Sequence, residues 1–279
     1  MKLLVTGVKG QLGHDVMQEL SKRGHIGIGV DIDEMDITDE SSVDEVISKA
    51  DVEGVVHCAA YTAVDRAEEE KDLCFKVNAQ GSKNIAKACR KNNLKMMYIS
   101  TDYVFAGNGQ EPWKPEDETA PLNIYGQAKY QGEVETTSNV DKHFIIRTAW
   151  VFGKNGNNFI KTMLRLGKEK GEVSVVSDQV GSPTYTTDLA VLIVDMMETD
   201  KYGIYHATNE GFCSWYDFAV EIFKQAGMEV KVKPVSTDAF PVKAVRPHNS
   251  RLDKSKLSQN GFSRLPSWQD AVSRYLKEL

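Results

Sequence analysis

The sequence predicts an α/β fold, in which a Rossmann-like, doubly wound parallel sheet is followed by a smaller C-terminal substrate-binding lobe. Through residue 149, short apolar segments alternate with segments of helical periodicity, a pattern typical of a parallel sheet with helices on both faces. A glycine-rich turn joins the first strand to the first helix, which favours a dinucleotide-binding unit. Beyond residue 150 the alternation loosens into helices separated by loops, which we expect to form the smaller lobe.

The N-terminal unit is predicted to be strand, turn and helix. Lys2–Thr6 is a short apolar strand, and a helix with apolar residues at helical spacing follows to about Arg23. Between them stand Gly7, Gly10 and Gly13. Glycines permit a tight turn and let the backbone approach a pyrophosphate, while the helix N-terminus supplies amide donors and a positive dipole. We therefore expect this turn to bind the diphosphate of a dinucleotide.

An acidic residue ends the second predicted strand, His25–Val30. Asp31 follows Gly13 by 18 residues, close to the spacing at which a carboxylate meets the adenine ribose hydroxyls. An acid at this place ordinarily favours NAD over NADP.

The remaining elements complete the sheet and then the smaller lobe. Further strands are expected at 54–58, 94–100 and 143–149, with a long helical region at 65–92 and a helix that carries Tyr125. Helices of the smaller lobe are expected near 159–170, 187–198, 215–226 and 267–277. We assign residues 1–149 to an NAD(P)-binding domain and 150–279 mainly to the substrate-binding lobe, with segments at about 172–208 returning to the first domain.

A tyrosine and a lysine four residues apart suggest the chemistry. Tyr125 and Lys129 share one helix face, so the ammonium can favour the phenolate and lower the pKa of the tyrosine. This spacing alone is expected by chance. Here it follows both the glycine turn and a strand that ends in Ser100 and Thr101. The combination indicates hydride transfer, with Tyr125 as the proton donor.

Composition argues against several other classes of protein. The net charge of −6 and the lack of a long basic run disfavour a nucleic-acid binder. There is no apolar stretch of about 18 residues for a membrane span, and the N-terminus enters a strand at once, so we expect a cytoplasmic protein. The four cysteines form no C-x-x-C pair and there is no H-E-x-x-H, so neither disulfides nor a metal enzyme is expected.

Several longer stretches are more specific than either motif. They are Ala59–Asp65, Ser100–Phe105, Pro121–Gly126, Arg147–Phe152, Asn158–Phe159 with Met163–Arg165, Asp178–Thr184 and Arg246–Leu252. With the Gly-x-x-Gly-x-x-Gly turn, they resemble the dTDP-4-dehydrorhamnose reductase family of extended short-chain dehydrogenases/reductases over essentially the full length. The resemblance implies NADPH- or NADH-dependent reduction of dTDP-4-dehydro-L-rhamnose to dTDP-L-rhamnose. Because Asp31 favours NADH whereas the family commonly accepts NADPH, we expect both to be used.

The resemblance also implies roles for individual residues. The catalytic residues are Thr101, Tyr125 and Lys129, with Thr101 hydrogen-bonded to the sugar oxygen and Lys129 holding the nicotinamide ribose. Cofactor contacts fall on Gly7, Gly10, Gln11, Leu12, Gly13, Asp31, Asp36, Ile37, Ala60, Tyr61, Thr62, Ile99, Tyr125 and Lys129. Substrate contacts fall on Thr62, Val64, Thr101, Asp102, Trp150 and Arg246. Core packing is the alternative for Val64 and Trp150, and anchoring of a loop to a carboxylate is the alternative for Arg246.

Three other functions can be weighed. A sugar-nucleotide dehydratase is disfavoured because Tyr103, rather than a second acid, follows Asp102. A nucleotide-sugar 4-epimerase would use a similar Tyr and Lys. A regulatory subunit resembling methionine adenosyltransferase beta would share the fold without the catalysis, but the intact catalytic residues favour an enzyme.

A metal-bridged dimer also stays open. Some family members bind Mg²⁺ through carboxylates at a dimer contact, and Asp15 stands where a glutamate is expected. A homodimer and Mg²⁺ are therefore left open, and no metal ligand is assigned.

Overall fold

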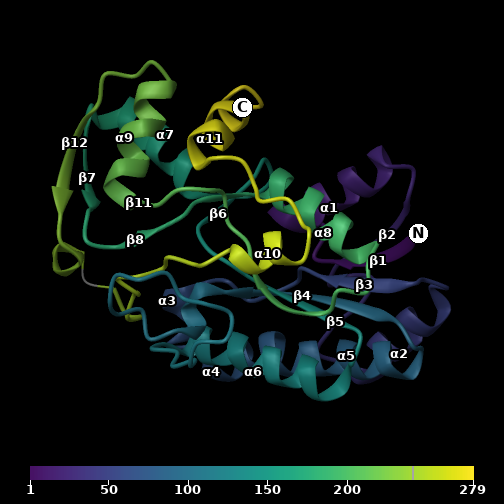
Figure 1. Cartoon of the computed structure of the whole chain (residues 1–279). Helices are drawn as coiled ribbons and strands as arrows, with labels where there is room; N and C mark the ends of the chain where they lie inside the picture. The colour runs from purple at the N-terminus through teal and green to yellow at the C-terminus, as the bar shows by residue number, and fades with distance from the viewer. Residues whose placement is uncertain (241) are drawn as a thin grey trace.

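The computed structural model describes residues 1–240 and 242–279. At its centre lies a sheet of six strands in the order β10-β5-β4-β3-β1-β2, in which every neighbouring pair is parallel (Figure 1). The strands are β1 (Lys2–Thr6), β2 (Ile26–Val30), β3 (Gly54–His57), β4 (Lys95–Thr101), β5 (His143–Thr148) and β10 (Gly203–His206). The strand order reverses at β1 and β3, and in such sheets ligands bind beyond the carboxyl ends of the strands at this point. The predicted α/β fold is confirmed.

Helices cover both faces of this sheet (Figure 1). One face carries α1 (Gln11–Lys22) and α8 (Thr186–Met197), and the other carries α2 (Glu40–Lys49), α5 (Gly81–Lys91) and α6 (Ile124–Asn139). The apolar face predicted for the first helix is buried against α8. Val16 and Leu20 of α1 lie in one cluster with Leu189 and Ile193 of α8. This packing fixes where the N-terminus of α1 lies above the sheet.

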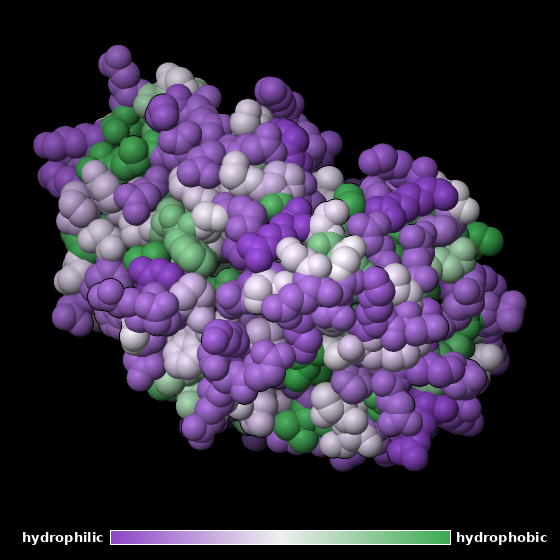
Figure 2. All heavy atoms as spheres, viewed as in Figure 1, coloured by the Kyte–Doolittle hydropathy of each residue, from purple (hydrophilic) through white to green (hydrophobic). Residues whose placement is uncertain are grey.

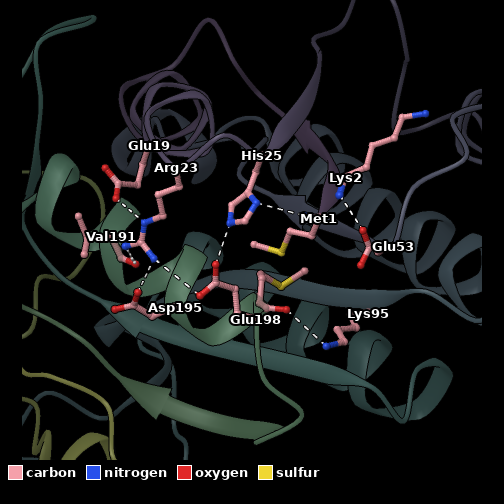
Figure 3. A network of polar contacts seen from close by, with 11 residues as sticks. Met1, Lys2, Glu19, Arg23, His25, Glu53, Lys95, Val191, Asp195 and Glu198 are labelled. Carbon is pink, nitrogen blue, oxygen red and sulfur yellow. Dashed lines mark hydrogen bonds and ion pairs between the residues drawn. The ribbon is translucent and has the colours of Figure 1, made fainter.

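A polar network ties the far end of α1 to α8 and to the N-terminus (Figure 3). Arg23 donates from Nε to Glu19 at 2.6 Å and forms an ion pair with Asp195 of α8. His25 lies between the Met1 amine, 3.1 Å from Nδ1, and Glu198, 2.7 Å from Nε2. Most of these side chains are partly exposed, so we expect their ion pairs to orient α1 relative to α8 and to contribute little to the free energy of unfolding.

The smaller lobe packs its own core beside the carboxyl ends of the strands (Figure 1). Its helices are α7 (Phe159–Lys170), α9 (Trp215–Gln225) and α11 (Trp268–Leu276). Short strand pairs join β6 (Val151–Phe152) to β9 (Thr184–Tyr185), β7 (Glu172–Val176) to β12 (Lys231–Val235), and β8 (Val180–Gly181) to β11 (Cys213–Ser214). Aromatic side chains fill the centre, where Phe152 stacks on Tyr185 with centroids 5.3 Å apart. A 3₁₀ turn, η3 (Thr237–Ala239), follows β12, whereas α10 (Ser255–Gln259) contacts β10 and buries Leu257 in the core of the sheet layer.

The chain crosses between the two regions more than once. Of the segment 172–208, α8 and β10 join the sheet layer, whereas β7 pairs with β12 in the smaller lobe. Strand β10 extends the sheet beside β5, with Tyr205 opposite Ile146. The sequence did not predict the strands of the smaller lobe. Strands β6, β8, β9 and β11 have two residues each and carry no usable alternation of side chains. Strands β7 and β12 have five residues each and were missed.

The long helical region predicted at 65–92 is wrong in its continuity. It contains α3 (Val64–Ala67), α4 (Lys71–Phe75), a π-helical turn η1 (Lys76–Gln80) and α5. The first break falls at the acidic run Glu68–Glu70, where Glu70 leaves helical geometry. Glu68 accepts the backbone N–H of Ile124, and Glu70 accepts the hydroxyl of Tyr61. These carboxylates therefore contact other elements rather than forming a solvated helix face.

Polar side chains cover most of the visible face, and the apolar patches on it are small and separate (Figure 2). Within the described residues, no helix is both long and apolar enough to cross a bilayer. All four cysteines are free thiols.

Candidate active site

A cavity of about 610 Å³ opens at the carboxyl ends of the strands, beside the neighbouring strands β1 and β3, where the strand order reverses. The glycine turn, the ends of β2 and β4, helix α6 and the start of the smaller lobe all contribute to its walls. Seventeen of the nineteen predicted binding and catalytic positions stand on this wall: Gly7, Gly10, Gln11, Leu12, Gly13, Asp31, Asp36, Ile37, Ala60, Thr62, Val64, Ile99, Thr101, Asp102, Tyr125, Lys129 and Trp150. Tyr61 and Arg246 lie off it.

The glycine turn leaves no room for side chains. Gly7 adopts a φ of +70°, and a Cβ there would lie 2.8 Å from the backbone N of Ala59. A Cβ at Gly13 would lie 2.3 Å from the carbonyl oxygen of Gly7. No side chain caps the N-terminus of α1, which begins after Gly10. Free backbone amides at a helix N-terminus are suited to bind a phosphate anion.

Two carboxylates, Asp31 and Asp36, line the part of the cavity that follows β2. Asp31 accepts the backbone N–H of Lys9 at 3.0 Å and that of Ile32 at 3.0 Å. The side chain of Lys9 is paired with Asp33. Asp36 accepts the N–H and hydroxyl of Thr38, and these hydrogen bonds lower the pKa of its carboxyl.

One buried amide holds the loop that follows β3. Asn78, in the π-helical turn η1, accepts the backbone N–H of Tyr61 and donates to its carbonyl, both at 2.9 Å. This pair of bonds orients residues 60–62, so that Ala60 and Thr62 face the cavity while the ring of Tyr61 turns to Glu70. Single π turns are frequent at functional sites. No local pattern in the sequence singles out Asn78.

The three residues predicted to be catalytic come together at the ends of β4 and α6. Asn123 caps α6 by accepting the N–H of Gly126 at 2.8 Å, which places Tyr125 in the first turn. Thr101 is the last residue of β4, and a 3₁₀ turn, η2 (Asp102–Val104), follows it. Tyr103 meets the ring of Tyr125 edge-on, with centroids 5.5 Å apart.

The expected lowering of the pKa of Tyr125 by Lys129 is wrong. Burial, with the nearby Asp102 carboxylate, raises the pKa of Tyr125 well above its ordinary range. The ammonium of Lys129 instead donates to the carbonyl of Ile99 at 2.6 Å and lies 4.2 Å from the ring centroid of Tyr98. Burial lowers the pKa of Lys129 to about 7. Tyr125 and Lys129 do lie on one helix, as predicted. The spacing of the two residues carries no information about the Ile99 carbonyl, which belongs to another element.

Asp102 is a buried carboxylate with one unused oxygen. Its Oδ1 accepts the hydroxyl of Thr101 at 3.0 Å, whereas Oδ2 has no hydrogen-bond partner among the described residues. Burial raises the pKa of this carboxyl to about 6. An unpaired buried oxygen is costly. Asp102 lines the cavity, and its Oδ2 lies buried behind the cavity surface.

A buried ion pair fixes the catalytic elements to one another. Glu133, one turn beyond Lys129 on the same helix face, accepts Nε and Nη2 of Arg147 at 2.9 and 2.7 Å. It also accepts the hydroxyl of Ser100 at the end of β4. Both ionic side chains are 3% exposed. Planar, two-bond pairing of this kind is geometrically specific, and it sets the position of α6 on β4 and β5.

Arg246 takes the second of its two predicted alternatives. It forms an ion pair with Asp65 at 2.7 Å and donates to the hydroxyl of Tyr103 at 3.0 Å. The arginine therefore anchors the 244–250 segment to α3, and only Tyr103 of this group stands on the cavity wall. Trp150 does stand on the wall, stacked against Trp215 of the smaller lobe.

Sequence reasoning missed several wall residues, among them Lys9, Cys58, Tyr103, Thr148 and Trp215. Lys9 and Tyr103 adjoin recognised motifs, so proximity could have suggested them. Trp215 begins α9, more than sixty residues after Trp150 in the chain, and no local sequence pattern connects it to the cavity.

The carboxylate expected near a metal is engaged elsewhere. Asp15 accepts the hydroxyls of Thr186 and Thr187, and burial raises its pKa. Across the described residues, no three His, Cys, Asp or Glu side chains are grouped so as to hold a metal ion.

Comparison with known proteins gives one family. The model of the RmlD substrate binding domain matches residues 1–279. The dTDP-4-dehydrorhamnose reductase of Escherichia coli K12 is 40% identical, over 100% of this chain and 98% of that protein. The spore coat polysaccharide biosynthesis protein SpsK of Bacillus subtilis is 39% identical, over 99% and 97%.

A solved structure agrees over the whole fold. The crystal structure of dTDP-4-dehydrorhamnose reductase from Bacillus anthracis, in complex with NADP, superposes with a TM-score of 0.97 at 45% identity, over 100% of this chain and 99% of that one.

Proposed function

The chain belongs to the RmlD substrate binding domain family, and on that premise we propose that it is a dTDP-4-dehydrorhamnose reductase. It uses NADPH or NADH to reduce dTDP-4-dehydro-L-rhamnose to dTDP-L-rhamnose. The observation that carries the proposal is the convergence of Thr101, Tyr125 and Lys129 on a cavity that begins at an uncapped, glycine-lined helix N-terminus.

The residues present fit a nicotinamide dinucleotide. Gly7 and Gly13 leave a cradle that a Cβ would fill, and the amides that start α1 are free to bind a diphosphate. Asp31 and Asp36 line the end suited to an adenosine. A bound NAD(P)H supplies the hydride at its nicotinamide ring.

The chain's own residues supply position and the proton. Tyr125 donates its phenolic proton to the carbonyl oxygen as negative charge grows there, and its raised pKa keeps that proton in place until then. The Thr101 hydroxyl, whose single proton goes to Asp102 Oδ1 in the structure, turns from that carboxylate to donate a hydrogen bond to the same oxygen. The Lys129 ammonium, which uses one of its three N–H donors on the Ile99 carbonyl, holds the nicotinamide ribose and stabilises the phenolate left on Tyr125. Asp102, with its free Oδ2, accepts a sugar hydroxyl.

The regions divide the work. Residues 1–149, with α8 and β10 beside β5, form the dinucleotide-binding part, and residues 150–279 form the smaller lobe, which contributes Trp150, Val151 and Trp215 to the cavity wall for the sugar nucleotide. We further propose that the enzyme acts in the cytoplasm. A homodimer is testable by light scattering with and without a chelator, and an unchanged mass would argue against a bridging Mg²⁺.

The test is oxidation of NADPH and NADH with enzymatically generated dTDP-4-dehydro-L-rhamnose. The wild-type protein is expected to turn over with both cofactors, and Tyr125→Phe to lose about 100- to 10,000-fold in kcat while still binding cofactor. The matched control is Tyr130→Phe on the same helix.

Two outcomes would sink the proposal. Tight cofactor binding without turnover in the wild type would favour a regulatory subunit of the methionine adenosyltransferase beta kind. Interconversion of nucleotide-sugar epimers without net cofactor oxidation would favour a 4-epimerase.

A further inference from the structure

Two indoles from different parts of the chain lie face to face on the cavity wall. Trp150 follows β5, and Trp215 is the first residue of α9. Their ring centroids are 3.7 Å apart and their planes differ by 16°. Both residues line the cavity. The stack therefore joins the end of the sheet to the smaller lobe across the place where a substrate would sit.

The backbone of Trp150 is held in an unusual conformation. Its φ is +50°, in the left-handed region that bulky residues rarely adopt. Such backbone strain is unfavourable and clusters at active sites and ligand-binding sites. The carbonyl of Trp150 accepts the N–H of Thr184 at 3.1 Å, directly before the paired strands β6 and β9.

The ring of Trp150 is already enclosed. Gly181 lies so close that a Cβ on it would be 3.0 Å from Cε2 and 3.1 Å from Cζ2 of the indole. Trp215 covers a face of the same ring. A sugar ring that packs on that face must first displace Trp215.

Trp215 also packs against aromatic side chains of the smaller lobe. Its ring meets Phe159 of α7, with centroids 4.6 Å apart and planes inclined at 51°, and Phe159 stacks on Phe218. Ser214 and Asp217 form a capping box at the start of α9, which fixes the backbone of Trp215 and leaves its side chain as the movable part.

We propose that Trp215 is an aromatic gate, which stacks on Trp150 in the free protein and gives up that face to the hexose ring of a sugar nucleotide. The ligand class is a nucleotide-linked hexose, whose apolar C–H face suits an indole. This inference rests on the proposed function for the identity of the ligand. Nothing in it requires the catalytic step, so binding alone can test it.

The test is circular dichroism of the wild-type protein, because two stacked indoles give an exciton couplet that a single indole cannot give. Addition of saturating dTDP-L-rhamnose should remove most of the couplet, whereas dTDP, which lacks the hexose, should leave it intact. Trp215→Phe should abolish the couplet in the free protein, and Trp268→Phe, in the core of the smaller lobe, should retain it.

A binding measurement gives the second arm. Trp215→Leu removes the stack that the hexose has to break, so its affinity for dTDP-L-rhamnose should rise by up to about tenfold, with affinity for dTDP and NADH unchanged. Unchanged NADH binding also reports that the variant is folded, and if it is not, Trp215→Met, which also lacks an aromatic ring, replaces it. A couplet that survives saturating dTDP-L-rhamnose, or a folded Trp215→Leu that binds it less tightly, would overturn the gate. Neither result depends on turnover, so the gate and the reductase activity can fail separately.

Discussion

Substitution of Asp102 by Asn should make the protein more stable at neutral pH, although it removes a group from the active site. The carboxyl is 3% exposed, and its Oδ2 lacks a partner among the described residues. Burial raises its pKa from 3.8 to about 6. The folded state therefore binds more protons than the unfolded state between pH about 4 and about 6, and the stability of the wild type falls as pH rises through that window.

The size of the effect on stability follows from the difference between the two pKa values of Asp102, 3.8 and about 6. At about 1.4 kcal/mol per pH unit, the charged carboxylate costs the folded wild type about 3 kcal/mol above pH 6. An Asn side chain does not titrate. The stability of Asp102→Asn relative to wild type should thus be about 3 kcal/mol more favourable at pH 7.5 than at pH 3.5, whatever the fixed cost of the new amide.

Urea unfolding at the two pH values, followed by circular dichroism, measures this difference directly. Asp141→Asn, at an exposed position, is the matched control for the chemical change itself. A relative stability that differs by less than about 1 kcal/mol between the two pH values would refute the reasoning. A gain in stability accompanied by loss of turnover would identify Asp102 as a site where stability is given up for function.

Two further perturbations test the surroundings of the site. Because burial lowers the pKa of Lys129 to about 7, its contribution makes wild-type stability rise with pH from about 7 to about 10. Lys129→Met should flatten that rise in urea titrations, and an unchanged slope would count against a buried ammonium. Arg147→Met leaves Glu133 buried without its ionic partner and should cost about 3–5 kcal/mol, whereas Arg165→Met, which breaks an exposed pair, should cost less than about 1 kcal/mol. Similar costs for the two arginines would contradict the account of the buried pair.

The sequence by itself determined the features that depend on near neighbours in the chain. Gly7, Gly10 and Gly13 predict the turn because a tight backbone path is a local requirement. Tyr125 and Lys129 share a helix face because the helical repeat places them there. Asp31 lies on the cavity wall because a strand of known length ends just before it.

Only the tertiary structure decided which partners these groups meet. Lys129 donates to the Ile99 carbonyl, and Arg246 pairs with Asp65. In the same way, α9 brings Trp215 onto Trp150. These contacts join segments distant in the chain, and spacing in one segment carries no information about the distance to another. Burial then sets the electrostatics, because the pKa of a carboxyl or an ammonium depends on the groups and the water that the whole fold leaves around it.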